Sequence, residues 1–182
     1  LLYAYAAMTP DEEEKYKKFT KSIQRRAATI GGNDMNDYPL KMLIFNRARM
    51  VKNSKNRIPF GIELLQKHKR DSWIVFTENK KQAKEFNKII NTKGYKSAIY
   101  NTDLDNAERE ENLNNFKNGN LNVLVSCTAL DEGFDMPEAD GAMILSASSS
   151  KRQRIQRMGR VLRITANKQN ALIVTVYSSK TE

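Results

Sequence analysis

Up to about residue 70, apolar residues recur at the three- and four-residue steps that are typical of amphipathic helices. Thr9-Pro10-Asp11-Glu12 predicts a helix start, because it offers a hydroxyl cap, a proline for the first turn and an acidic residue that completes a capping box. The apolar face of this helix consists of Tyr16, Phe19 and Ile23. Gly31-Gly32 predicts where the helix ends.

Two more helices are expected before residue 70. One covers Leu40 to Val51 and the other lies around Ile62 to His68. Basic side chains gather along this stretch: Arg47, Arg49, Lys52, Lys55 and Arg57. Such a patch is more often a solvated helix face than a binding site. We therefore interpret residues 1–70 as a helical lead-in to the part of the chain that follows.

After residue 70 the pattern changes to short apolar runs that alternate with helical periods. The run Trp73-Ile74-Val75-Phe76 is typical of a strand buried on both faces. Further strands are expected at 97–100, 121–125, 142–145 and 171–177. Helices are expected between strands, one ending at Gly94 with a left-handed cap and one opened by Asp105 and Glu108. This alternation predicts an α/β fold over residues 71–182, in which helices flank a mostly parallel sheet in three layers. Working residues are expected in loops at the carboxyl ends of the strands.

The net charge of the chain then indicates which class of partner to expect. The chain has 31 Lys and Arg against 21 Asp and Glu, a formal net charge of +10, which makes polyanions the first partners to expect. With Cys127 as the one cysteine and His68 as the one histidine, an internal disulfide is excluded and no metal site is expected. No apolar run reaches the roughly 18 residues of a membrane span, and the N-terminus lacks the order of a signal peptide. We therefore expect a cytoplasmic protein with no membrane partner.

The segment from Ser149 to Ile164 is the most informative for chemistry. On a helix, Gln156, Arg160 and Arg163 fall within about 60° of one another, away from the apolar positions. Gly159 inside such a helix favours close approach by a ligand or a second backbone. Two arginines one turn apart suit a phosphate chain, because each guanidinium can pair with phosphate oxygens in a bidentate way. The alternative is an arginine-rich surface helix with no ligand.

A second segment, from Ser126 to Asp140, follows a predicted strand. Gly133 would let the backbone come close to a ligand, and the carboxylate of Asp135 could accept hydrogen bonds from sugar hydroxyls. Pro137 prevents an ordinary helix from continuing. Taken alone, a glycine and an aspartate in a loop are most often part of a turn.

Together, in this order, these segments resemble the second motor domain of superfamily 2 DEAD/DEAH-type helicases and translocases. WIVFT at 73–77 is similar to helicase motif IV, LDEGFDMPEAD at 130–140 to motif V and QRMGRVLR at 156–163 to motif VI. The resemblance implies a RecA-like helicase C-terminal domain of the P-loop NTPase class over 71–182. It also implies that residues 1–70 are a helical inter-domain linker.

The family resemblance implies a role for each matching residue. Arg160 and Arg163 would be arginine fingers that neutralise charge on the γ-phosphate of ATP as the phosphoryl group leaves. The residues implied for the nucleotide site are Gly133, Asp135 and Gln156. The candidates for contacts with a nucleic-acid backbone are Thr77, Thr102 and Thr128.

A complete motor also needs a phosphate loop of the form G-x-x-x-x-G-K-[ST] and an acidic magnesium-binding motif. Neither occurs in this sequence. We therefore expect a C-terminal motor domain cut from a longer helicase, with ATP and Mg2+ held mainly by an N-terminal motor domain of the full-length chain. The fragment alone is predicted to be inactive, and DNA is favoured over RNA. The alternatives are a stand-alone basic nucleic-acid-binding module with this fold and no ATPase activity, and an unrelated nucleotide-binding α/β domain.

Overall fold

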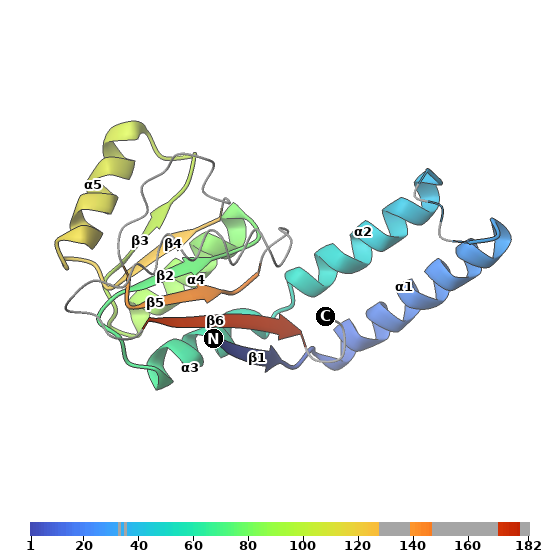
Figure 1. Ribbon diagram of the computed structural model, residues 1–182, viewed down its shortest axis with the longest axis horizontal. Coiled ribbons are helices and arrows are strands. Elements are labelled where there is room, and N and C mark those ends of the chain that lie inside the picture. Colours follow the sequence, from blue (N-terminus) through green and yellow to red (C-terminus); the bar gives the residue numbers. More distant parts are fainter. Residues whose placement is uncertain (33, 35, 128–138, 147–170, 179–182) are drawn as a thin grey trace.

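Six parallel strands form one sheet within the residues that the structure, a computed structural model, describes: 1–32, 34, 36–127, 139–146 and 171–178 (Figure 1). The strands lie in the order β1-β6-β5-β2-β4-β3. Their bounds are β1 Leu2–Ala6, β2 Trp73–Phe76, β3 Ser97–Tyr100, β4 Val123–Ser126, β5 Gly141–Ile144 and β6 Leu172–Ser178. Every pairing is parallel, which confirms the predicted α/β sheet.

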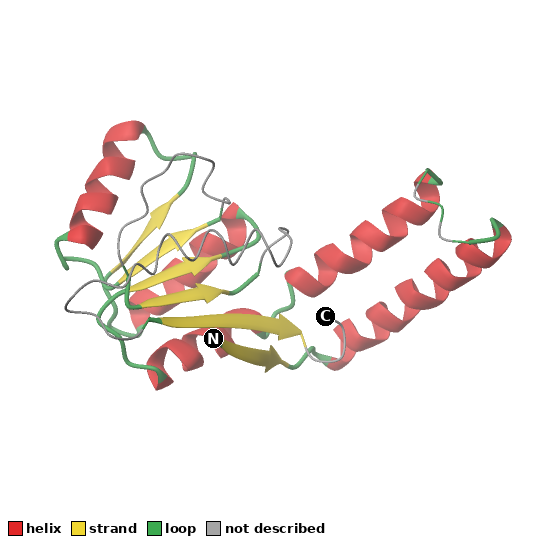
Figure 2. Ribbon diagram, in the orientation of Figure 1, coloured by secondary structure: helices red, strands yellow, loops and turns green. Residues whose placement is uncertain are grey.

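Helices lie on both faces of this sheet (Figure 2). Their bounds are α1 Pro10–Thr29, α2 Tyr38–Lys52, α3 Arg57–Lys67, α4 Lys80–Thr92 and α5 Asn106–Lys117. On one face α3 and α4 pack against the strands, and on the other α5 packs through Phe116 against Ile74 and Leu124. The three layers predicted from the alternation of strands and helices are therefore present.

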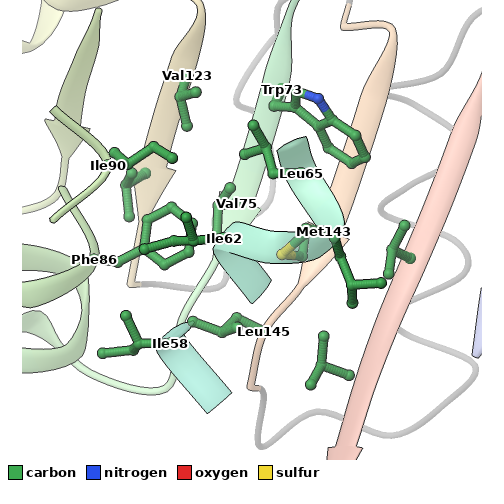
Figure 3. Packing of buried hydrophobic residues seen from close by; sticks show 14 of the residues in the cluster. Ile58, Ile62, Leu65, Trp73, Val75, Phe86, Ile90, Val123, Met143 and Leu145 are labelled. Carbon is green, nitrogen blue, oxygen red and sulfur yellow. The ribbon is translucent and has the colours of Figure 1, made fainter. Parts of the chain in front are cut away.

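The larger part of the core lies between the sheet and the pair α3 and α4 (Figure 3). Ile62 of α3 and Phe86 of α4 meet over Val75, the third residue of β2. Trp73 is fully buried, and its ring lies against Gly141 of β5, where an added Cβ would come within 2.5 Å of the ring. A glycine at the start of β5 thus makes room for the indole.

The local signals that predicted helix ends are confirmed. Thr9 caps α1, its hydroxyl accepting from the Glu12 N–H while the Glu12 carboxylate accepts from the Thr9 N–H. Asp105 and Glu108 form the same reciprocal pair at the start of α5. Gly94 has a φ of 86°, the left-handed conformation expected after α4.

Two features differ from the sequence-based expectation. The strand β1 was not predicted; Ala4 and Ala6 point into the core while the strand pairs with β6, more than 160 residues away in the sequence. The helix α3 begins at Arg57 rather than near Ile62, and Arg57 is buried, so its place in the predicted solvated patch was wrong. Both β1 and α3 join residues before 70 to the sheet. The boundary at residue 70 stays a prediction.

The helices α1 and α2 form a hairpin that projects from the sheet (Figure 1). Near its tip Arg26 donates from Nε to the Asp37 carboxylate at 3.0 Å, and near its middle Arg47 donates to the Thr20 hydroxyl at 3.1 Å. At its base the Glu12 carboxylate accepts from the Ser54 hydroxyl at 3.1 Å. Among the described residues, no helix combines the length and apolar character needed to cross a membrane.

Candidate functional site

Thr77 lies at the carboxyl edge of the sheet, directly after β2. Its N–H donates to the Ser126 carbonyl at 2.8 Å, and its hydroxyl lies 3.3 Å from the carbonyl oxygens of both Asn79 and Ser126. The side chain is only 4% exposed. In this arrangement Thr77 joins the end of β2 to the end of β4, and a contact between its hydroxyl and a phosphate stays a prediction.

The loop that follows Thr77 is held to the end of α2. Lys52 pairs with the Glu78 carboxylate at 3.4 Å, and the Asn79 side-chain amide donates to the Asn53 side chain at 2.6 Å. Asn79 also caps α4, accepting from the Gln82 N–H at 2.9 Å. The hairpin base is therefore fixed to the loop between β2 and α4.

Thr102 lies in the loop after β3, on the same edge of the sheet. Thr102 is exposed, as is Asp103 after it, whereas Asn101 before it is buried. The Asp103 carboxylate pairs with Lys80 and lies 3.9 Å from the Lys84 ammonium. The hydrogen bond from Lys80 lowers the pKa of Asp103, so the carboxylate is charged at neutral pH. These pairs join the start of α4, which follows the loop after β2, to the loop after β3, and they place two lysines near the predicted contact residue Thr102.

A buried arginine holds the ends of β5 and β6. The Nη1 group of Arg57 donates to the carbonyl oxygens of Leu145 at 2.9 Å and Val176 at 2.8 Å. Its Nε donates to the Val51 carbonyl at 3.1 Å and to the Ser178 hydroxyl at 3.2 Å. Because buried carbonyls are costly to leave without donors, one guanidinium here stabilises the ends of two strands and of α2.

The other predicted site residues lie outside the described residues. They are Thr128, Gly133, Asp135, Gln156, Arg160 and Arg163. In sequence, the segment 128–138 follows β4 and the segment 147–170 joins the end of β5 to β6. Within the described part of the chain, no three His, Cys, Asp or Glu side chains gather in a way that could hold a metal ion.

Two residues that the sequence did not indicate, and a third that it placed in a solvated basic patch, contribute to this edge. Lys80 and Asp103 join the start of α4 to the loop after β3, and Arg57 holds the ends of β5 and β6. The sequence could have indicated that Lys80 lies at the carboxyl edge, because it directly follows Asn79, a helix-capping residue close after the end of β2. The role of Arg57 had no such signal, since its partners are backbone carbonyls about 90 and 120 residues away.

Comparison with known proteins adds the family. Residues 56–165, well over half of the chain, match the family described as helicase conserved C-terminal domain. The DNA 3'-5' translocase XPB2 of Sulfurisphaera tokodaii is 28% identical over 97% of this chain and 42% of its own length. The ATP-dependent RNA helicase DBP3 of Candida glabrata is 26% identical over 84% of this chain and 31% of its own length. The chain thus spans less than half the length of either curated relative.

A solved structure agrees with the sheet topology. The Sulfolobus solfataricus SWI2/SNF2 ATPase core in complex with dsDNA matches 97% of this chain and 40% of that chain, with a TM-score of 0.73. At 14% identity this likeness concerns the fold alone. The family match over residues 56–165 shows that this chain belongs to the helicase conserved C-terminal domain family, and its six-stranded parallel sheet is a RecA-like domain of the kind found in superfamily 2 helicases and translocases.

Proposed function

We propose that this chain is the C-terminal motor domain of an ATP-dependent helicase or translocase that acts on nucleic acid, with DNA favoured over RNA. ATP and Mg2+ would be held mainly by an N-terminal motor domain of the full-length protein. The lengths of the relatives support this division, because the chain spans 42% of XPB2 and 31% of DBP3. The isolated chain is then expected to hydrolyse ATP poorly.

The match to XPB2 is the observation that carries the choice of DNA. It covers 97% of this chain, so it includes the α1–α2 hairpin as well as the sheet, and that relative is a DNA translocase. The RNA helicase DBP3 is matched over 84% of this chain at 26% identity, and the rRNA helicase RRP3 of Yarrowia lipolytica over 96% at 25% identity, so the preference for DNA rests on the higher identity of XPB2, 28%.

For the chemistry, Arg160 and Arg163 would stabilise the charge that develops on the γ-phosphate, with Gly133, Asp135 and Gln156 on the nucleotide. Support comes from the spacing of these residues in the sequence and from the fixed positions of Leu145 and Val176 on either side of the segment 147–170. Arg57 fixes the carbonyl of Leu145 before that segment and the carbonyl of Val176 after it.

For the nucleic acid, Thr77, Thr102 and Thr128 would lie along the backbone, as the carboxyl edge of the sheet suits phosphate contacts from hydroxyls and N–H groups. The lysines beside Asp103 support this assignment, since Lys80 and Lys84 place positive charge on the same edge as Thr102. Cationic groups near a strand of phosphates give binding that weakens as salt rises.

The test is an ATPase assay of the intact protein that contains this chain, with single-stranded DNA, duplex DNA and RNA compared at equal nucleotide concentration. Arg160→Ala and Arg163→Ala are each expected to lower turnover by about a thousandfold while nucleic-acid binding survives, because an arginine finger typically contributes 10³-fold or more. Arg154→Ala is the matched control, because it removes the same charge from the same segment. On the helix predicted from the sequence, Arg154 lies on a different face from Gln156.

Near-normal turnover in either finger variant would show that the finger assignment is wrong. An intact protein that binds nucleic acid but lacks any stimulated ATPase activity would favour the basic binding module instead. Stimulation by RNA alone would reverse the preference for DNA.

A further inference from the structure

The projecting hairpin is acidic in the first turn of α1 and basic over the rest of its length. Residues 15–52 contain ten Lys and Arg against two Asp, a net charge of +8, and the acidic residues at 11–14 bring residues 10–52 as a whole to +4. One of the two acids, Asp37, caps α2 and is paired with Arg26. Beyond the first turn of α1, the α1–α2 hairpin is therefore an arm whose charge is nearly all positive.

The face of α2 that points away from α1 also carries exposed apolar side chains. Tyr38 is 70% exposed, Met42 38% and Phe45 53%, and Arg49 follows on the same face, since steps of three and four residues keep a helix face. The Lys41 ammonium lies 5.9 Å from the centre of the Phe45 ring. We call these residues the outer stripe: Tyr38, Lys41, Met42, Phe45 and Arg49.

The outer stripe is held in a fixed position relative to the carboxyl edge of the sheet. The end of α2 is joined to the loop after β2 through Lys52 with Glu78 and Asn53 with Asn79. From there to Tyr38 the helix extends by about 20 Å at 1.5 Å per residue. The stripe therefore leads away from the edge where Thr77 and Thr102 lie.

The composition of the stripe selects its partner. Exposed rings beside cations suit unpaired nucleic acid, because bases stack on aromatic side chains while phosphates pair with lysine and arginine. No acidic residue interrupts α2 between Tyr38 and Lys52. Pairing of two copies through this face is disfavoured, because each α2 helix carries four Lys and Arg and no Asp or Glu, and two such helices would repel each other.

We infer that the outer stripe of α2 is a second contact for single-stranded nucleic acid, in which Tyr38 and Phe45 stack on bases and Lys41 and Arg49 pair with phosphates. The inference rests on the proposed function, since nucleic acid is its ligand, and adds a binding surface outside the sheet edge. A single strand of nucleic acid that leaves the carboxyl edge of the sheet would pass along this arm.

Binding of a fluorescein-labelled oligothymidylate to the 182-residue chain, followed by anisotropy, tests the inference. Tyr38→Ala with Phe45→Ala is expected to weaken binding by at least about tenfold, because each stacked base contributes on the order of tenfold in affinity. The matched control is Tyr3→Ala with Tyr5→Ala, which removes two exposed tyrosines from β1. Circular dichroism shows whether each variant is folded.

A second pair of variants separates the stripe from the general charge of the arm. Lys41→Ala with Arg49→Ala is expected to weaken binding several-fold more than Lys21→Ala with Arg25→Ala, which removes the same charge from exposed positions of α1. A labelled duplex of the same length is expected to respond less to the ring substitutions, since its bases are already stacked.

Wild-type affinity in the Tyr38 and Phe45 variant, or an equal loss in the β1 control, would overturn the inference while the ATPase test of the proposed motor stood unaffected. A change in sedimentation mass with unchanged affinity would identify the stripe as a contact between copies. Failure of the wild-type chain to bind either probe at low salt would also refute the stripe contact, and the Arg160 and Arg163 variants would still test the motor separately.

Discussion

Arg57 donates a hydrogen bond from Nη1 to the carbonyl oxygen of Leu145, 2.9 Å away, and this bond joins the first turn of α3 to the end of β5. The same guanidinium reaches the Val176 carbonyl in β6 and the Val51 carbonyl in α2. A charged side chain placed in this way links the hairpin, the helix α3 and two central strands. Arg57 is buried although Lys55 and Asn56, which precede it, are polar.

Replacing this guanidinium should cost much stability. In Arg57→Met the carbonyls of Leu145 and Val176 lose a buried donor, and each such loss typically costs about 1–3 kcal/mol. We expect the free energy of unfolding to fall by about 3 kcal/mol or more in urea titrations followed by circular dichroism. Arg49→Met is the control, because Arg49 is exposed and should change stability by less than about 0.5 kcal/mol. Equal stability of the two variants would contradict the structural role of Arg57.

The contact between Trp73 and Gly141 gives a second prediction. In Gly141→Ala the new Cβ would come within 2.5 Å of the indole, which must move within a packed core at a cost of about 1–3 kcal/mol. Trp73 is the only tryptophan, so its displacement should also change the emission spectrum.

The control for this substitution is Gly119→Ala. Gly119 has a φ of 75° and open space around it, so alanine there introduces backbone strain of about 1 kcal/mol without touching the indole. We expect lower stability and an unchanged spectrum. An unchanged spectrum in Gly141→Ala would mean that the ring is not confined as described.

Features that depend on neighbouring residues were predictable from the sequence. The caps at Thr9 and Asp105 and the run at Trp73 follow from local chemistry, and the structure confirms all three. The strand β1 was missed because its alternation of Tyr3 and Tyr5 with small residues becomes a strand only through pairing with β6. Such pairing joins residues that local patterns cannot connect.

The candidate site also combines features that the sequence predicted with features that it could not predict. The edge of the sheet that carries Thr77 and Thr102 was predicted, because parallel strands end together. That the Thr77 hydroxyl faces carbonyl oxygens was not predictable, since it depends on how β2 and β4 align. The roles of Arg160 and Arg163 stay predictions, and both residues lie outside the described part of the chain.

Glu12 predicts a pH dependence of stability. Burial acts to raise the pKa of its carboxyl group, but hydrogen bonds from Thr9, Lys55 and Ser54 outweigh burial and hold the pKa below its ordinary 4.5. A lowered pKa in the folded state gives stability that is present above 4.5 and is lost as the pH falls through the folded pKa. We expect Glu12→Gln to be less stable than the wild type at neutral pH, with the difference shrinking below about pH 4.

Urea titrations at several pH values between about 7 and 3 measure this difference. Glu14→Gln serves as the control, since Glu14 is exposed and its pKa is lowered by a hydrogen bond from Lys18 alone on the surface. Its effect on stability should be much smaller at every pH, because exposed ion pairs contribute little. A pH-independent gap between Glu12→Gln and the wild type would show that the carboxylate charge is not what stabilises the base of the hairpin.

Asp103 should restrain nucleic-acid binding at the carboxyl edge. Its carboxylate pairs with Lys80 and lies 3.9 Å from Lys84, so it competes with any phosphate for these two cations. Asp103→Asn is expected to raise the affinity for an oligothymidylate about threefold at low salt and to steepen the salt dependence, because more lysine charge becomes available for phosphates. Asp71→Asn makes the same change in net charge at an exposed position before β2, on the opposite edge of the sheet. Equal gains in both variants would attribute the effect to net charge, whereas a gain in Asp103→Asn alone would locate the nucleic-acid backbone beside Lys80.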